Sequence, residues 1–236
     1  MTVEEIATAI GMATSTTYRH VRALVQAGFL DPVSGAGYAL GPGFIRYDRV
    51  LRQNDQLIHI AEPAMRELLA RTSQNAVVLL CRRFKDCVMC VHDIEGAAPH
   101  VATSYERGVA MPMFLGATSK AILANLPDRT LKNVYLANEA VIHSTLKVHD
   151  WATFKKHFRE IRRAGYALTD SEIVKGRVGI AAPISRGDQV VAGISLAGIT
   201  DMPNDAALTE FITEVKSAAA RISAGLSSLE APRTAK

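Results

Sequence analysis

The sequence predicts an α+β fold in two parts, a small N-terminal unit of helices with a β-hairpin and a larger unit built on an antiparallel sheet. Two observations predict it. Before residue 42, two stretches with helical periodicity are followed by two short β-prone pieces joined by a Pro/Ser/Gly loop. After residue 56, β-prone runs are interspersed with amphipathic stretches of helical periodicity.

The composition bounds the class of protein only loosely. The chain has 236 residues, 48% of them hydrophobic, which is enough for at least one full core and one or two domains. A formal net charge of +4 permits nucleic-acid binding without requiring it. There is neither an apolar run of about 18 residues nor a signal-peptide pattern, so we expect a cytoplasmic protein with no membrane partner.

The first expected element is a short helix at residues 2–10. Thr2 and Glu5 form a capping box, which is typical of a helix start. One apolar face of this helix is made by Val3, Ile6, Ala7 and Ile10. Gly11 then breaks the helical pattern.

The stretch 12–30 predicts a second helix whose first turns are unusual. Four consecutive hydroxyl residues, at 14–17, open it, although threonine is a mediocre helix former. Val21 and Leu24 are expected to face inward, and Gly28 stands where a left-handed C-terminal cap would lie. The residues expected to face outward are Thr14, Ser15, Thr16, Tyr18, Arg19 and Arg22.

A hairpin signal follows, with β-prone pieces at residues 29–30 and 38–40. Helix, tight turn, helix and hairpin is the order of a winged helix-turn-helix. In that motif the start of the second helix enters the major groove, where short hydroxyl side chains let the backbone approach phosphates closely. We therefore expect the six outward residues of the second helix to bind double-stranded DNA. A capped amphipathic helix with a solvated polar face is the alternative.

A helical connection is predicted at residues 43–54, and the larger unit begins at Leu57. Its first helix carries a long apolar stripe made by Leu57, Ile60, Ala61, Ala64, Met65, Leu68 and Leu69. Further elements are expected as strands at 76–82, 87–94 and near 100–104, helices from Ala117 and at 151–164, strands at 166–169, 179–185 and 189–197, and a C-terminal helix from Asn204.

Neither a metal site nor a cofactor is expected. Cys87 and Cys90 form a C-x-x-C motif, but they lie in a β-prone run, where residues three apart point to opposite faces and cannot share one zinc ion. No second cysteine pair follows. Buried core thiols are the expected role, because free cysteine is commonly buried.

Catalysis is the competing class of function. The chain contains no G-x-S-x-G, H-E-x-x-H or G-x-x-x-x-G-K motif. Ser119 and Lys120 are adjacent rather than at S-x-x-K spacing. Asp170 and Glu172 could act as acid and base, but alternate residues in a turn usually face water. We expect no enzyme; the alternative is a metabolic enzyme that binds a small molecule in the C-terminal α+β part.

The segment GATSKAILA, residues 116–124, predicts the start of a helix. Unpaired backbone N–H groups at such a start bind anions, and a carboxylate fits that geometry. Ordinary capping by Thr118 or Ser119 is the alternative interpretation of the same residues.

Three segments, in this order, resemble the IclR family of bacterial transcription regulators. They are TVEEIATAIGMATSTTYRHVRALVQAGFL, GVAMPMFLGATSKAILANLP and IRRAGYALTDSEIVKGRVGIAAPISRGDQVVAGISLAG. The resemblance implies a winged helix-turn-helix at residues 1–41, a linker helix at 42–56, a GAF-like effector-binding domain at 57–230 and a tail at 231–236. The family usually has a further helix ahead of the first segment, and that helix is expected to be missing here, where Met1 directly precedes the segment.

The resemblance also implies partners and a function. Such regulators usually form dimers or dimers of dimers and respond to small organic acids. The expected function is therefore a ligand-responsive regulator that binds an operator, senses a small carboxylic acid and controls a catabolic or metabolic operon.

Matching the positions of the family's pocket gives a set of expected effector-binding residues. They are Thr103, Met111, Gly116, Ala117, Thr118, Thr169, Asp170, Gly179, Ser195 and Ala197. Three of these, Ala117, Gly179 and Ala197, are very small, so a ligand larger than a two-carbon acid is expected.

Overall fold

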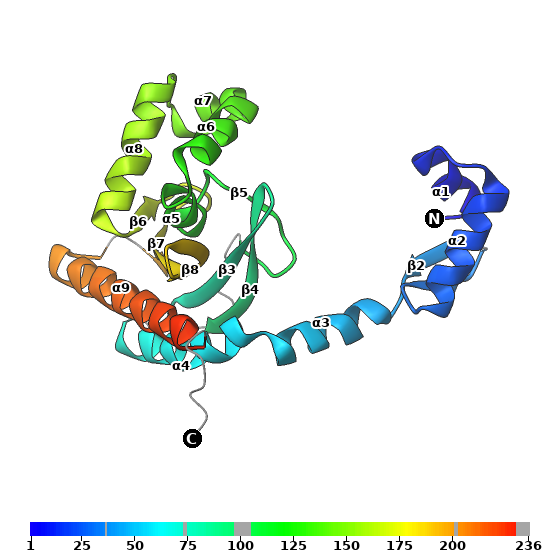
Figure 1. Ribbon diagram of the computed structural model, residues 1–236, viewed down its shortest axis with the longest axis horizontal. Coiled ribbons are helices and arrows are strands. Elements are labelled where there is room, and N and C mark those ends of the chain that lie inside the picture. Colours follow the sequence, from blue (N-terminus) through cyan, green and yellow to red (C-terminus); the bar gives the residue numbers. More distant parts are fainter. Residues whose placement is uncertain (36, 73–74, 97–104, 201–202, 230–236) are drawn as a thin grey trace. The chain divides into compact units, whose positions relative to one another are not determined.

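The chain folds into two compact units, Met1–Asp55 and Gln56–Lys236 (Figure 1). The computed structural model describes residues 1–35, 37–72, 75–96, 105–200 and 203–229. It confirms the predicted α+β class, with a helix-turn-helix unit followed by a mixed unit on an antiparallel sheet.

The N-terminal unit begins with two helices, α1 (Val3–Ile10) and α2 (Thr14–Gln26). The capping box of Thr2 and Glu5 is confirmed, since each side chain accepts a hydrogen bond from the backbone N–H of the other residue. Gly11 ends α1 in the left-handed conformation, with φ of 65°. These features make the predicted helix–turn–helix.

The predicted hairpin and the predicted helix at residues 43–54 follow. Strand β1 (Leu30–Val33) pairs with β2 (Gly37–Leu40), and α3 spans Gly43–Asn54. Gly43 donates its N–H to the carbonyl of Gly28 at 2.8 Å, and a Cβ on Gly43 would lie 2.5 Å from that oxygen. This close backbone approach is possible only without a side chain. The wing and the start of α3 are thereby tied to the end of α2.

The C-terminal unit contains a six-stranded sheet in the order β5-β4-β3-β8-β7-β6. All neighbouring strands are antiparallel. The strands are β3 (Val77–Phe84), β4 (Cys87–Glu95), β5 (Met111–Pro112), β6 (Ala167–Asp170), β7 (Arg177–Arg186) and β8 (Gln189–Thr200).

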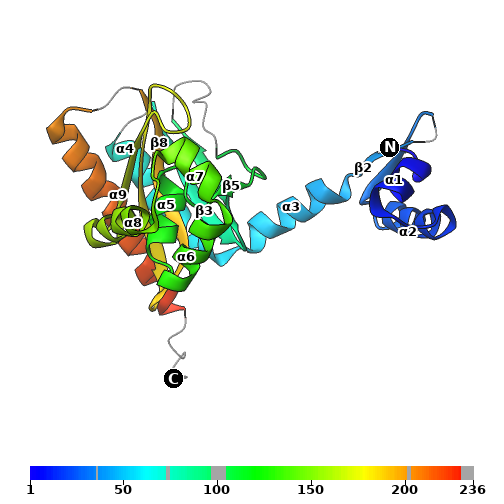
Figure 2. The same ribbon diagram turned by 90° about the horizontal axis from the view of Figure 1, so that it is seen from above.

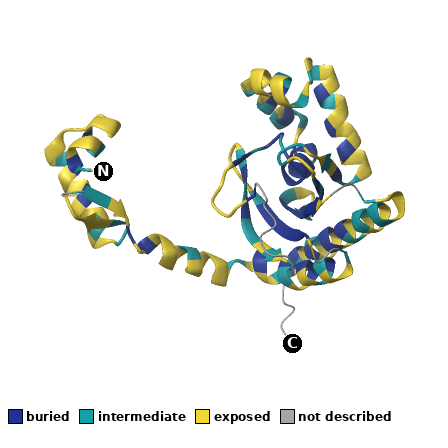
Figure 3. Cartoon of the chain, turned by 180° about the vertical axis from the view of Figure 1, so that it is seen from behind, coloured by how far each residue is buried: buried dark blue, intermediate teal, exposed yellow. Residues whose placement is uncertain are grey.

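Helices cover both faces of this sheet. On one side lie α4 (Gln56–Arg71) and α9 (Asp205–Ser228); on the other lie α5 (Ala117–Ala124), α6 (Asp128–Ala137), α7 (Glu139–Leu146) and α8 (Trp151–Ala164) (Figures 1 and 2). Residues 77–81 of the central strand β3 are all apolar because consecutive residues enter different cores. Figure 3 shows this buried sheet between helices whose outer faces are exposed.

Three elements, α6, α7 and β5, were not predicted from the sequence. Both helices are short and lack a side-chain N-cap, so no end signal marks them, although Leu131, Val134 and Tyr135 stand at helical spacing in α6. Buried Leu131, Tyr135 and Ile142 anchor them in the core. The strand expected near residues 100–104 lies outside the described residues. No helix in the described part of the chain has both the length and the apolar character that crossing a membrane requires.

Candidate functional site

The N-terminal unit presents the start of α2 without a side-chain cap. Ala13 occupies the N-cap position, and the N–H groups of Thr14 and Ser15 find no acceptor in the part of the chain that the structure describes. Such groups at a positive helix end bind phosphate. The start of α2 therefore offers a site for an anion.

Cationic and polar side chains surround this helix start. Of the six predicted DNA-binding residues, Thr16 is half-buried, and the exposed ones are Thr14, Ser15, Tyr18, Arg19 and Arg22. Helix α2 contains no acidic residue. Among the described residues neither Arg19 nor Arg22 has an ion-pair partner, so both guanidinium groups can reach an external anion.

One expectation about α2 was wrong. Leu24 is 42% exposed, although the sequence predicted that it would face inward. The buried side of the helix instead runs through Thr17 and Val21, which are four residues apart. The hydroxyl of Thr17 can be buried because it donates to the carbonyl of Ala13 at 3.1 Å.

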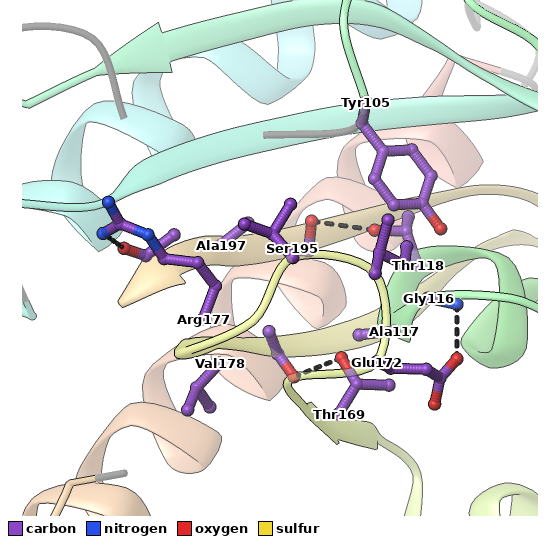
Figure 4. A pocket seen from close by; sticks show the side chains of 14 residues that line it. Tyr105, Gly116, Ala117, Thr118, Thr169, Glu172, Arg177, Val178, Ser195 and Ala197 are labelled. Atoms are coloured by element: carbon purple, nitrogen blue, oxygen red, sulfur yellow. Dashed lines mark hydrogen bonds between the residues drawn. The ribbon is translucent and has the colours of Figure 1, made fainter. Parts of the chain in front are cut away.

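The C-terminal unit has a cavity of about 60 Å³ at the start of α5, beside β6, β7 and β8 (Figure 4). Its walls are mostly apolar, and its polar groups are concentrated at the helix start. The cavity is lined by Tyr105, Gly116, Ala117, Thr118, Thr169, Glu172, Ile173, Val174, Arg177, Val178, Gly179, Ser195, Ala197 and Gly198.

Gly116 gives the start of α5 its geometry. Its φ of +80° is left-handed, and a Cβ there would lie 2.5 Å from the Tyr105 hydroxyl and 2.6 Å from Ile173 Cδ1. The N–H of Gly116 donates to Glu172 Oε1 at 2.8 Å. The N–H groups of Ala117 and Thr118 have no acceptor within the described chain. Two donors are therefore available at the cavity.

Side-chain capping by Thr118 or Ser119 does not occur. Thr118 Oγ1 instead donates to Ser195 Oγ at 2.8 Å, across to β8, and both hydroxyls are buried. Ser119 Oγ lies 2.8 Å from the Tyr105 hydroxyl, which in turn donates to the Leu115 carbonyl at 2.9 Å. Burial raises the pKa of Tyr105, so its phenol stays neutral and holds the loop before α5.

Seven of the ten predicted effector residues line this cavity: Gly116, Ala117, Thr118, Thr169, Gly179, Ser195 and Ala197. Met111 does not; it is a buried core residue of β5. Asp170 lies on the rim of a separate, wider hollow. Thr103 falls outside the described residues. Thr169 and Asp170 differ because consecutive residues of a strand point to opposite sides, so only one of the two can face the cavity from β6.

Sequence reasoning missed seven lining residues: Tyr105, Glu172, Ile173, Val174, Arg177, Val178 and Gly198. Several belong to the loop between β6 and β7, which folds over the start of α5 (Figure 4). One signal was present, since a loop between two predicted strands that both carry pocket residues must pass close to that pocket. Arg177 donates to the Gly198 carbonyl and to Thr200 Oγ1, each at 2.8 Å.

The residues weighed for metal binding and catalysis have other partners here. Cys87 donates its thiol to the Phe84 carbonyl, while Cys90 is buried directly opposite Cys81 in the sheet. Glu172 binds α5, and Asp170 accepts a hydrogen bond from a neighbouring serine, so the two carboxylates do not form an acid–base pair.

A helix-turn-helix unit joined to an α+β unit with a cavity is the organisation of a transcription regulator with a sensory domain. The chain belongs to the IclR family. Residues 50–224 match the family description "Bacterial transcriptional regulator IclR C-terminal", and residues 1–34 match "IclR helix-turn-helix domain".

Individual relatives agree with this assignment. The HTH-type transcriptional regulator KipR of Bacillus subtilis is 28% identical over 94% of this chain and 88% of its own length. The transcriptional repressor IclR of Escherichia coli is 26% identical over 92% of this chain and 80% of its own. The structure of an IclR homolog from Microbacterium hydrocarbonoxydans, complexed with 4-hydroxybenzoate, has a TM-score of 0.73 and 20% identity, covering 97% of this chain and 92% of that one.

Proposed function

We propose that this protein is a ligand-responsive transcription regulator that binds an operator through α2 and senses a small carboxylic acid in the cavity at the start of α5. Binding of the acid would control transcription of a catabolic or metabolic operon. The protein would act in the cytoplasm, where that operator lies. A regulator, rather than an enzyme, is favoured because the family's named relatives are regulators and the cavity presents no acid–base pair.

The start of α5 is the observation that carries the proposal of an acid. Two unbonded N–H groups, at Ala117 and Thr118, face a small cavity where the helix dipole favours negative charge. Ser195 supports a polar ligand, because its hydroxyl accepts from Thr118 and keeps its own hydrogen for a further acceptor. The homolog from Microbacterium hydrocarbonoxydans that binds 4-hydroxybenzoate, itself a carboxylate, is in keeping with this chemistry.

The cavity volume limits the size of the acid. At about 10–15 Å³ for each water-sized group, a cavity of about 60 Å³ holds roughly four to six such groups. We propose an acid of about four to six non-hydrogen atoms, a range that includes two-carbon and three-carbon acids, so a ligand larger than a two-carbon acid stays a prediction. The small side chains at Ala117, Gly179 and Ala197 line the cavity together with Ile173 and Val174 of the β6–β7 loop.

A thermal-shift screen of small carboxylic acids, followed by calorimetry, tests the proposal. A binder at a hundred times its Kd should stabilise the C-terminal unit by about 2.7 kcal/mol. Ala117→Leu should abolish this stabilisation, because the larger side chain fills the space beside the free donors. The same variant should still bind operator DNA, since α2 belongs to the other unit.

Ala220→Leu, the same change at an exposed position of α9, is the matched control and should leave ligand binding unchanged. If Ala117→Leu does not fold, Gly179→Ala serves instead: its Cβ would lie 3.1 Å from Thr169 Oγ1 and 3.4 Å from Ala117 Cβ, inside the cavity. Equal affinity of the wild type and both cavity variants for the same acid would place the ligand elsewhere.

A further inference from the structure

A carboxylate of this chain already lies at the helix start where the proposed effector would bind. Glu172, in the β6–β7 loop, accepts the Gly116 N–H through Oε1 at 2.8 Å (Figure 4). The free N–H groups of Ala117 and Thr118 are the next two along the same turn. An effector carboxylate at those donors would therefore share one helix end with the negative charge of Glu172.

The other carboxylate oxygen of Glu172 also contacts α5. Oε2 pairs with the ammonium group of Lys120, a residue of α5 that is only 5% exposed. A lysine so buried needs a negative partner, because an unpaired charge in such a place is strongly unfavourable. Glu172 thus binds the first turn of α5 at two points, one on each side of its carboxylate.

Glu172 also separates two hollows. The second hollow, of about 480 Å³, lies between α5, α7, α8 and the β6–β7 loop, and its lining includes Lys120, Lys156 and Glu160. Glu172 lines both this hollow and the cavity, and among the described residues it is the only one that does so. Its side chain therefore borders both spaces.

We propose that Glu172 is a built-in competitor of the effector. When the effector's carboxylate binds at the N–H groups of Ala117 and Thr118, it also takes the Gly116 N–H, and Glu172 withdraws towards Lys120 and the second hollow. This inference rests on the proposed function, because it requires a carboxylate ligand at α5. Two like charges at one helix end repel, so Glu172 lowers the affinity for the acid and sets the concentration at which the protein responds. Lys120 keeps the displaced carboxylate paired.

The test measures binding of sodium acetate, with sodium chloride at equal ionic strength as the reference. Glu172→Gln keeps the shape of the side chain and removes its charge, and its amide oxygen can still accept a hydrogen bond from Lys120. The variant should therefore bind acetate about tenfold more tightly than the wild type, a change of about 1.4 kcal/mol. A side chain that merely supported the fold of the loop would give the opposite result, a loss of affinity on substitution.

Two further variants make the test decisive. Glu160→Gln removes a negative charge from the second hollow without touching α5, and should leave acetate affinity unchanged. Glu172→Asp retains the charge, but its shorter side chain cannot span from Gly116 to Lys120. It should tighten acetate binding less than the glutamine variant, and it provides the measurement if Glu172→Gln does not fold.

The outcomes separate this inference from the proposed function. Acetate binding that is abolished by Ala117→Leu but not strengthened by either change at Glu172 overturns the competition and leaves the carboxylate site in place. Unchanged or weaker binding in Glu172→Gln also overturns it. If acetate binds none of the proteins, including the variant with the competing charge removed, then both the competition and the carboxylate site are wrong.

Discussion

Single residues determine the geometry of the cavity, either because they have no side chain or because their side chains link two elements. Gly116 is required because its left-handed backbone packs against Tyr105 and Ile173, where a Cβ would overlap both side chains. Thr118 and Ser195 connect the start of α5 to the central strand β8 through one buried hydrogen bond. This hydrogen bond adds to the apolar packing of the buried helix α5 against the sheet.

The Thr118–Ser195 hydrogen bond should be measurable in stability. Ser195→Ala should cost about 1–3 kcal/mol, because it leaves the buried Thr118 hydroxyl without its acceptor. Thr118→Val removes the donor of the same hydrogen bond. The double variant should therefore lose about 1 kcal/mol less free energy of unfolding than the two single variants added together. Urea unfolding of the four proteins gives this coupling.

The control for this cycle pairs Ser195→Ala with Thr209→Val, an exposed position on α9. That pair should be additive to within about 0.5 kcal/mol, since distant sites without shared partners act independently. Full additivity of the Thr118 and Ser195 changes would mean that the hydrogen bond contributes nothing to stability.

At the scale of elements, α2 shows that a segment with low helix propensity at its start can still form a helix within the fold. Its four opening hydroxyl residues provide no side-chain cap, and the fold holds the helix instead through Thr17 and Val21. The helix start is left with free N–H groups and with cations that have no acidic neighbour in α2. This combination is unfavourable for an isolated helix and favourable for contact with phosphate.

We expect Arg19→Ala and Arg22→Ala to weaken operator binding. An arginine that contacts a base edge should cost about 1–3 kcal/mol and relax specificity, whereas one that contacts phosphate should weaken binding to all sequences alike and reduce the salt dependence. Fluorescence anisotropy at several salt concentrations distinguishes the two.

Arg163→Ala, which removes an exposed cation from α8 in the other unit, is the matched control. It should leave DNA affinity nearly unchanged. Wild-type affinity in both α2 variants would remove α2 from the DNA interface.

At the scale of the whole molecule, one chain presents one copy of α2, whereas helix-turn-helix regulators commonly read two half-sites related by two-fold symmetry. The linker helix α3 supports self-association, because it leaves Ile45 and Leu51 77% and 66% exposed. Phe44, Tyr47 and Val50 of the same helix are exposed as well, and several large apolar side chains exposed on one helix are typical of a protein–protein contact.

We therefore expect at least a dimer at micromolar concentration, measured by light scattering. Ile45→Glu with Leu51→Glu should shift the protein towards the monomer and weaken operator binding, while the fold of the C-terminal unit is unchanged. A wild-type monomer, both with and without operator DNA, would contradict the prediction.

The sequence by itself determined the elements with strong periodicity and clear end signals. The predicted helices at residues 43–54 and 151–164 coincide with α3 and α8, and the capping box of Thr2 and Glu5 is present. These features are local, because caps and apolar stripes act within a few residues of each other. Family resemblance added the segments at α5, β7 and β8 that line the cavity.

Only the tertiary structure decided which side chains meet there. Glu172 is 56 residues from Gly116 and 52 from Lys120, and Tyr105 reaches Ser119 through a loop conformation that no local pattern specifies. The pairing of β6 with β7 and of β7 with β8 in one sheet brings these groups together. Burial then fixes their partners, because a charge or hydroxyl removed from water must find one.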